Sequence, residues 1–338
     1  MELIKVYGNE ELTLLGAIEL YLSHIGRKGL RKATINNAKV RLSIIANWLL
    51  AKYPDLKPST TTVHHLRAYQ DDRIAEARVM KSTINTDISM MHRLFTWLYE
   101  EHLIQHNPSD GLHKVKDDKR QTEPYTDEEI GKLLAVTQPK KTHAQARNHL
   151  MQLLLLDTGL RCNEMLSVKF KDIDFLPTGG KISVPADAAK NRLSRDVPFS
   201  RTVADEIRDY MKLRNKLKEI TEEDYVFCSQ EAEKMTDRAV QQIFQQIGNA
   251  SGVRKIKRVS AHSYRATFAV SCLRNGMQVF ALMQLGGWQS VEALAPYVRL
   301  AGDDLINAHA TASPVERLKN KKDASNNPLI RMKKKRLR

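Results

Sequence analysis

The chain has 338 residues, which predicts two domains with sizeable apolar cores, and it contains no apolar run near the roughly 18 residues of a membrane helix. Its formal net charge of +15 favours a polyanionic partner, nucleic acid before an anionic membrane, although a net +9 of that charge lies between Arg317 and Arg338. Three cysteines without metal-ligand spacing, and a charged N-terminus without a signal-peptide core, predict a soluble intracellular protein.

Residues 12–107 show helical spacing of apolar side chains, with interruptions at residues 26–29, 53–55 and 107–108. We expect three long helices with buried stripes formed by Leu14, Ile18, Tyr21, Leu22 and Ile25; by Val40, Ile44, Ile45, Trp48 and Leu49; and by Ile84, Ile88, Met91, Leu94, Phe95 and Leu98. A shorter fourth helix is expected around residues 66–77, and Thr34 is the expected N-cap of the second helix. The pattern predicts a small helical bundle over residues 10–110.

Cations gather in the loops and at the helix starts of this bundle. They are Arg27, Lys28, Arg31, Lys32, Lys39, Arg78 and Lys81, and a later basic loop adds Arg254 and Lys257. Helix N-termini with nearby cations suit phosphate contacts, so these residues are candidate nucleic-acid contacts. A solvated basic surface is the alternative interpretation.

Residues 111–123 are charged and poor in apolar side chains, which is typical of an interdomain linker. Thr126 then caps a new helix, and the next helix, residues 147–158, is apolar on nearly every side and belongs in the centre of a domain. It ends at Thr158-Gly159-Leu160-Arg161, and a further helix is expected from residue 165 toward residue 174. Arg161 then projects from a rigid turn as a positioned guanidinium, or serves only as a capping or salt-bridged residue.

The period of the pattern changes after residue 180. Residues 181–185 and 194–199 predict two short strands joined by residues 186–193, where Lys190 can reach over a bound ligand. A solvated turn lysine is the alternative interpretation of Lys190. Helices are expected to resume at Ser200 and at Thr236.

Residues 260–300 carry the densest set of chemically active side chains. His262 and Arg265 lie three residues apart, so on a helix they share a face and place a proton-handling group beside a phosphate clamp. After Gly286-Gly287-Trp288 comes Tyr297, a weak nucleophile at neutral pH unless neighbouring groups help to remove its proton. Together these residues predict a phosphoryl-transfer site that needs no metal or cofactor. The alternative is a buried histidine, an ion-paired arginine and two core aromatic residues, each explained separately.

Taken in order, these segments resemble the tyrosine recombinase family, also called phage-type integrases, over residues 126–300. The resemblance rests on five motifs: Thr158-Gly159-Leu160-Arg161 with Glu164, Lys190 with Arg195-Asp196-Val197-Pro198, His262 with Arg265, Leu285-Gly286-Gly287-Trp288, and Tyr297. The resemblance implies a mainly α chain with a small β-hairpin or sheet (α+β). Its parts are the N-terminal bundle, an integrase-type catalytic domain over residues 124–315, and a basic tail over residues 316–338.

The resemblance also implies a mechanism. Tyr297 attacks the scissile phosphate, Arg161 and Arg265 stabilise the developing charge, Lys190 protonates the leaving 5′ oxygen and His262 takes the tyrosyl proton. Trp288 steadies the phosphate through its N–H, and Glu164 orients the neighbouring cations. Two departures from the family pattern stand out: Trp288 replaces a commoner histidine, and Asn191-Arg192 leaves Arg192 as a reserve candidate for the hairpin cation.

The implied activity is site-specific DNA recombination through a 3′-phosphotyrosyl intermediate and a Holliday junction, for integration, excision or replicon resolution. We expect a two-domain enzyme without an arm-binding domain, acting in a mobile element as a homotetramer on two DNA duplexes, with accessory DNA-bending proteins as further partners. A cytoplasmic, nucleoid-associated location follows. The alternatives are an inactive sequence-specific DNA-binding protein on the same fold and a type IB topoisomerase.

Overall fold

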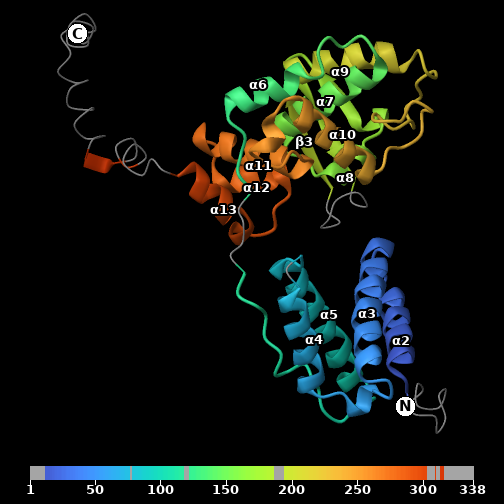
Figure 1. Cartoon of the computed structure of the whole chain (residues 1–338). Coiled ribbons are helices and arrows are strands. Elements are labelled where there is room, and N and C mark those ends of the chain that lie inside the picture. Colours follow the sequence, from blue (N-terminus) through green and yellow to red (C-terminus); the bar gives the residue numbers. More distant parts are fainter. Residues whose placement is uncertain are drawn as a thin grey trace, which may run out of the picture. The chain divides into compact units, whose positions relative to one another are not determined.

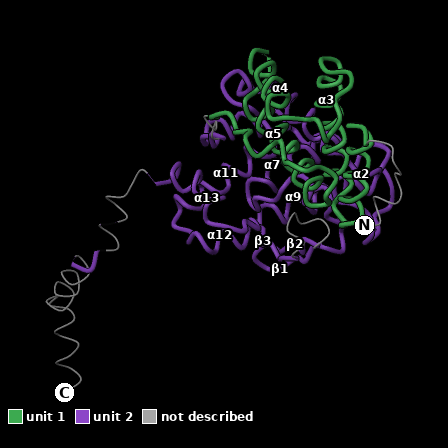
Figure 2. The backbone as a smooth tube through the Cα atoms, turned by 90° about the horizontal axis from the view of Figure 1, so that it is seen from below, with its two compact units in different colours: residues 1–120 green, residues 121–338 purple. Residues whose placement is uncertain are grey.

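The computed structural model describes residues 12–76, 78–117, 122–185, 194–302, 309 and 313–315. The chain forms two compact units, residues 1–120 and 121–338, which Figure 2 distinguishes by colour. The division lies within the predicted linker 111–123, while the exact domain limits stay predictions. Helices dominate both units, and the described part of the second unit contains one three-stranded sheet, so the predicted fold class is confirmed.

The described part of the first unit is a bundle of four helices with one short 3-10 turn. Its elements are α2 (Leu14–Arg27), α3 (Lys32–Lys52), η1 (Pro58–Thr60), α4 (Val63–Ala75) and α5 (Lys81–Glu100). Thr13 caps α2 by accepting a hydrogen bond from the Gly16 amide at 3.1 Å. All six residues of the predicted third stripe are buried along α5, as periodicity predicted.

The predicted face of α3 is partly wrong. Val40 is 57% exposed and Ile44 is 41% exposed, so neither side chain belongs to the core. The buried face instead consists of Ala38, Leu42, Ile45, Ala46 and Leu49. Helix α3 also begins at Lys32 with Arg31 as its N-cap, so Thr34 lies inside the helix and does not cap it. Because alanines occupy two positions of the buried face, α3 packs on its neighbours through small side chains that a search for large apolar residues overlooks.

A buried carboxylate ties three helices of this unit together. Asp87 of α5 is completely buried and accepts hydrogen bonds from Arg41 Nη1 of α3 at 3.2 Å and from the Tyr69 hydroxyl of α4 at 3.0 Å. Burial, and after it the Asp87 charge, raises the pKa of Tyr69, so its hydroxyl stays a donor. The three side chains therefore satisfy one another away from water.

We expect Asp87→Ala to lower the free energy of unfolding of this unit by about 3 kcal/mol, because it leaves Arg41 and the Tyr69 hydroxyl without their acceptor. This value is at the lower end of the range for breaking a buried ion pair, because the Arg41 side chain is 27% exposed and can be hydrated by solvent after the loss of Asp87. Urea unfolding followed by tryptophan fluorescence measures the change, because Trp48 and Trp97 both lie in this unit. Exposed Asp71 of α4 supplies the control: Asp71→Ala should change stability by less than about 0.5 kcal/mol. Equal losses for the two variants would contradict the role of Asp87.

The second unit surrounds a central helix. Its described elements are α6 (Asp127–Ala135), α7 (His143–Thr158), α8 (Cys162–Ser167), η2 (Phe170–Asp172), β1 (Ile173–Leu176), β2 (Gly179–Val184), β3 (Arg195–Ser200), α9 (Arg201–Arg214), α10 (Asp237–Ala250), η3 (Val253–Lys255), α11 (Ala261–Arg274), α12 (Val279–Gly286) and α13 (Val291–Ala301). Helix α7 packs against α9, α11 and β3, in agreement with its apolar circumference (Figure 1). The predicted cap Thr126 accepts a backbone N–H at the start of α6, and Ser200 and Thr236, where the sequence predicts that helices resume, do the same for α9 and α10.

The sheet has one strand more than expected. Antiparallel pairing joins β1 to β2, with Ile173 opposite Ile182, and β2 to β3, with Val184 opposite Arg195. The helix expected from residue 165 toward residue 174 is therefore wrong: α8 ends at Ser167. The Asp172 carboxylate accepts the Lys169 amide at 2.9 Å and stabilises a 3-10 turn there, which directs residues 173–176 into the sheet.

None of the helices in the described ranges combines the length and apolar character needed to span a bilayer. From the sequence, residues 303–312 can also form a short helix with Leu305, Ile306 and Ala308 on its apolar side; these residues, apart from His309, and the basic tail 316–338 lie outside the described residues.

Candidate active site

The Thr158–Arg161 turn brings the end of α7 against α11. Gly159 ends α7 with φ at +60°, and a Cβ atom there would lie 2.2 Å from the Phe268 ring. Only glycine permits both the left-handed backbone and this close approach. The carbonyl of Gly159 accepts a hydrogen bond from Arg265 Nη1, so the turn itself helps to hold an arginine of the predicted site.

Arg161 stands at the N-cap of α8 and points toward the end of α12. Its Nη1 donates to Glu164 Oε1 at 2.9 Å and to the Gly286 carbonyl at 3.3 Å, and its Nη2 donates to the Gly287 carbonyl at 2.8 Å. The side chain is 27% exposed, so the guanidinium is held in place but still open to a ligand. This is the rigid mount expected from the sequence.

Glu164 is the buried acid of the site, with 1% of its surface exposed. It closes a capping box on α8 by accepting the Arg161 amide at 3.0 Å. Arg195 adds two hydrogen bonds, from Nη2 at 2.7 Å and from Nη1 at 3.2 Å. Burial alone would raise the pKa of Glu164, but the bonds and charges of Arg195 and Arg161 outweigh it and hold that pKa below its ordinary value. The carboxylate is therefore ionised at neutral pH.

Arg265 of α11 is buried, with 4% of its surface exposed. Besides Gly159 it donates to the Gly286 carbonyl at 2.8 Å, and its guanidinium carbon lies 3.8 Å from the centre of the Trp288 ring. Burial first, and then the nearby Arg161 charge, lowers the pKa of Arg265 to about 9, so it remains a cation at neutral pH. Two of the five N–H donors bond backbone carbonyls in the described part of the chain, which leaves others for a phosphate.

His262 is the second residue of α11, one turn before Arg265, and is exposed to solvent. Partial desolvation, followed by the positive charges of Arg265 and Arg258, lowers the pKa of its imidazole. At neutral pH the ring is therefore uncharged and able to accept a proton.

Trp288 lies between Arg265 and Tyr297, with its ring in contact with both side chains. Helix α12 ends at Gly286, where a Cβ atom would lie 1.8 Å from the Trp288 ring, and the turn continues through Gly287 with φ at +66°. The centres of the Trp288 and Tyr297 rings are 5.9 Å apart, and their planes are inclined by 62° in an edge-to-face arrangement. Tyr297 of α13 is 8% exposed; burial raises the pKa of its hydroxyl, while Arg265 and Arg161 oppose that rise. The two cations therefore favour the phenolate.

The structure brings six of the seven expected catalytic residues together: Arg161, Glu164, His262, Arg265, Trp288 and Tyr297. Lys190 and the reserve candidate Arg192 lie outside the described residues. Sequence reasoning assigned no role to Arg195, although it noted the Arg-x-x-Pro ending of the hairpin. In the described ranges no group of three His, Cys, Asp or Glu side chains is placed to hold a metal ion.

The cations expected to contact nucleic acid are mostly exposed. Arg27, Lys28, Arg31, Lys32, Lys39, Arg78, Lys81 and Arg254 are all solvent-exposed. The α2–α3 turn and the α4–α5 turn lie at the same end of the first unit, which gathers most of these charges (Figure 1). Lys257 differs, because its ammonium donates to Glu129 Oε2 and to the Pro124 carbonyl, both at 3.0 Å. Its charge is thus already paired within the second unit.

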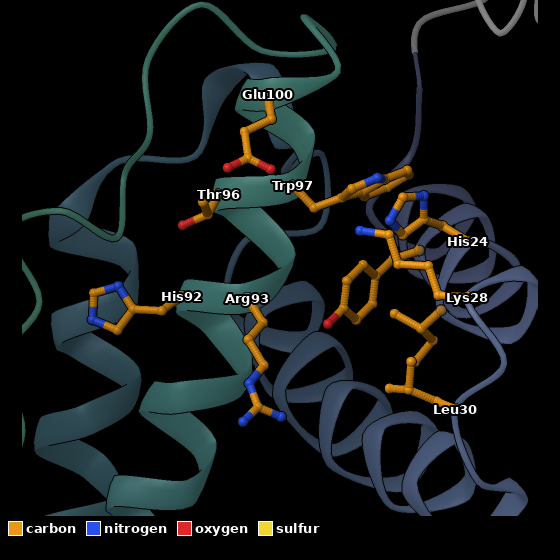
Figure 3. A pocket seen from close by; sticks show the side chains of 10 residues that line it. His24, Lys28, Leu30, His92, Arg93, Thr96, Trp97 and Glu100 are labelled. Carbon is orange, nitrogen blue, oxygen red and sulfur yellow. The ribbon is translucent and has the colours of Figure 1, made fainter.

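A recess of about 390 Å³ lies between α2 and α5, beside the α2–α3 turn. Tyr21 and His24 pack on Trp97 with ring centres 5.6 and 5.1 Å away, and Figure 3 shows Lys28 next to His24 at the edge. Arg93 and Glu100 complete the charged rim. The recess therefore has an aromatic wall and one of the expected phosphate-contacting cations.

The model of the phage integrase family matches residues 125–303. The chain is 28% identical over 258 residues to tyrosine recombinase XerC of Bacillus pumilus, which covers 73% of this chain and 81% of that protein. Its fold is similar to XerH site-specific recombinase bound to palindromic difH substrate, with TM-score 0.67, 18% identity and 90% of each chain covered. It is also similar to a lambda integrase in a tetramer bound to a Holliday junction, with TM-score 0.65, 16% identity, and 86% of this chain and 78% of that chain covered. Because the family match spans more than half of the sequence, the chain belongs to the phage integrase family and is a tyrosine recombinase.

Proposed function

We propose that this recombinase cuts and rejoins DNA at specific sites through Tyr297, by way of a 3′-phosphotyrosyl intermediate and a Holliday junction. The observation that carries the proposal is the cluster formed by Tyr297, Trp288 and Arg265: the Tyr297 ring lies 5.9 Å from the Trp288 ring, and the Arg265 guanidinium lies 3.8 Å from that same ring. A buried phenol beside two fixed cations is suited to attack on a phosphodiester, whose anionic oxygens the same cations bind.

The charge of the site matches the reaction. Three guanidiniums, on Arg161, Arg195 and Arg265, face the single carboxylate of Glu164 in the described part of the site, so it is net positive by two. A phosphodiester carries one negative charge, and attack by a phenolate oxygen produces a five-coordinate phosphorus with two. Preorganised donors therefore stabilise the transition state more than the bound substrate.

The remaining roles complete the proton balance. The bond from Tyr297 Oη to phosphorus forms while the bond from phosphorus to the 5′ oxygen breaks. His262, uncharged at neutral pH, takes the tyrosyl proton, and Lys190 gives a proton to the leaving 5′ oxygen. Arg192 is the reserve candidate for the hairpin cation. Trp288 steadies the phosphate through its indole N–H, and Glu164 orients the arginines. Attack on the phosphotyrosine by the 5′-hydroxyl of another strand then rejoins the DNA.

We further propose that duplex DNA lies along the exposed cations at the basic end of the first unit and along Arg254. The proposed assembly is a homotetramer on two duplexes, assisted by accessory DNA-bending proteins; the structure of a lambda integrase tetramer bound to a Holliday junction supports the tetramer. The enzyme then serves integration, excision or replicon resolution in a mobile element. Lys257 is the weakest of the proposed DNA contacts, because Glu129 already holds its ammonium.

Trapping on a suicide DNA substrate tests the proposal. The wild-type chain should form a covalent adduct on a nicked substrate carrying its site, and sequencing the trapped DNA should return one recurring sequence. Absence of any adduct would favour a DNA-binding protein without catalysis. Relaxation of a supercoiled plasmid without a specific site would favour a type IB topoisomerase.

Two truncations test the C-terminal region, which carries a net +9 between Arg317 and Arg338. Deletion after Asn320 should weaken DNA affinity without changing sequence preference and should flatten the salt dependence by about 0.9 log unit for each phosphate that the tail no longer neutralises. Deletion after Gly302 should additionally abolish tetramer assembly, because residues 303–312 are proposed to dock on the neighbouring protomer. Binding titrations at several salt concentrations and sedimentation of the synaptic complex measure the two effects. An unchanged salt slope contradicts DNA binding by the tail, and a complete tetramer contradicts the docking.

A further inference from the structure

Arg195 is the first residue of β3 and turns inward, with 12% of its side chain exposed. The hydrogen bonds from its side chain to described residues go to two other elements. Nη1 and Nη2 reach the two oxygens of Glu164 on α8, and Nε donates to the Leu285 carbonyl on α12 at 2.9 Å. One side chain thus links the sheet, the helix that follows Arg161 and the helix that precedes Trp288.

We propose that Arg195 is a positioning residue for DNA cleavage, which shares the Glu164 carboxylate with Arg161 and fixes the end of α12 against the site. The inference rests on the proposed function, because it assigns Arg195 a task in that same reaction. Arg195 acts through Arg161 and Trp288, and it is not itself required to touch the phosphate.

The sharing of Glu164 is visible atom by atom. Oε1 accepts from Arg161 Nη1 at 2.9 Å and from Arg195 Nη1 at 3.2 Å. Oε2 accepts from the Arg161 amide at 3.0 Å and from Arg195 Nη2 at 2.7 Å. The bidentate fork of Arg195 therefore takes up much of the carboxylate charge. Without Arg195, Arg161 is the one remaining side-chain partner of the Glu164 carboxylate among the described residues. The buried carboxylate then competes with the scissile phosphate for the Arg161 guanidinium.

The contact with α12 gives Arg195 a second effect. The last carbonyls of this helix point at the site, where Leu285 accepts from Arg195, Gly286 from Arg161 and Arg265, and Gly287 from Arg161. A helix C-terminus is the negative end of the helix dipole, so three guanidiniums stabilise it while it orients them. The packing is close, since a Cβ atom at Gly287 would lie 3.0 Å from the Arg195 guanidinium carbon. Loss of Arg195 frees the end of α12 and with it the Trp288 ring.

A purely structural role would make different predictions, and the second strand of the sheet offers a matched control. Lys181 of β2 pairs at the surface with Asp196 and Asp174, outside the site. Lys181→Met removes a cation from the same sheet without touching Glu164. The test compares this variant with Arg195→Met, Arg195→Lys, Glu164→Gln and the double variant Arg195→Met/Glu164→Gln.

Single-turnover cleavage of the suicide substrate is the first measurement. Arg195→Met should bind DNA with wild-type affinity and cleave about 10²-fold more slowly, the cost of misplacing a catalytic group by about 1 Å. Arg195→Lys should be intermediate, because an ammonium keeps the charge but lacks the fork. Adding Glu164→Gln to Arg195→Met should raise the rate about tenfold, because the competing charge is gone. Lys181→Met should cleave at the wild-type rate.

Thermal unfolding without DNA is the second measurement and does not depend on cleavage. Glu164 is faced by Arg161 from α8, Arg195 from β3 and Arg265 from α11. Removing Arg195 raises the pKa of Glu164 toward or above its ordinary value. The difference in stability between the wild type and Arg195→Met should therefore be largest at pH 7 and should decrease toward pH 4. The difference between Glu164→Gln and the double variant should stay the same over this pH range, because neither variant contains the Glu164 carboxylate.

Three outcomes overturn the positioning role: equal cleavage by Arg195→Met and Lys181→Met, no relief from Glu164→Gln, or a stability gap independent of pH. A wild-type chain that forms no adduct overturns the proposed recombination chemistry instead. In that case the pH dependence of unfolding still tests whether Arg195 holds Glu164.

Discussion

Tyr297→Phe is expected to bind the recombination site as tightly as the wild type and to form no covalent adduct. The substitution removes one oxygen and keeps the ring that packs between α11, α12 and α13 and lies 5.9 Å from Trp288. Stability should change by less than about 1.5 kcal/mol, the range of a single hydrogen bond. Catalysis should be lost completely, since no neighbouring group replaces a covalent nucleophile.

Gel analysis of the trapped adduct measures the effect, and Tyr210→Phe is the matched control. Tyr210 is buried in the same unit and donates its hydroxyl hydrogen to the Val226 carbonyl at 2.9 Å, away from the site. Its variant should lose some stability and keep cleavage. An adduct of wild-type yield from the Tyr297→Phe variant would show that the nucleophile is another residue.

Arg265→Gln should lower the cleavage rate about 10²- to 10³-fold, which corresponds to roughly 3 to 4 kcal/mol of transition-state stabilisation. The loss has two sources. A charged donor to the phosphate disappears, and the Gly159 and Gly286 carbonyls together with the Trp288 face lose the guanidinium that they contact. We therefore also expect a lower melting temperature. Arg265→Lys should recover little, because an ammonium cannot bond two carbonyls and stack on an indole at once.

Arg274→Gln provides the control for this second variant. Arg274 ends the same helix, is exposed, and donates to the Leu300 carbonyl at 3.1 Å. Its loss should leave the single-turnover rate unchanged. If Arg265→Gln cleaved at the rate of Arg274→Gln with intact DNA binding, Arg265 would have no part in stabilising the transition state.

Much of the site could be predicted from local rules. Arg161 and Glu164 lie on one short helix start, and His262 and Arg265 lie one turn apart, so spacing alone places each pair together. Gly159, Gly286 and Gly287 mark the turns that carry the neighbouring side chains, because only glycine tolerates those backbone angles and contacts. Joining these pairs into one site required the resemblance, since residues 161 and 297 are far apart in the chain.

Other features escaped prediction because they depend on contacts between distant segments. In the sequence, Asp87 is one polar residue among the apolar residues of a helix, and nothing near it indicates that it is buried. Its partners Arg41 and Tyr69 belong to two other helices. Arg195 reads as a surface residue of a strand, and only the packing of β3 against α8 and α12 turns it inward. No local pattern carries such information.

The sequence by itself determined the helical character of the chain, the helix starts at Thr126, Ser200 and Thr236, the order of the catalytic motifs and the family. These follow from periodicity, capping and local spacing, which act over a few residues. Only the tertiary structure decided that Val40 and Ile44 face outward, that residues 173–176 form a third strand, and that Arg195 shares Glu164 with Arg161. Each of these features depends on contacts between segments that are distant in the sequence. Which side chains are buried, and which charges pair, is decided only when those segments pack together.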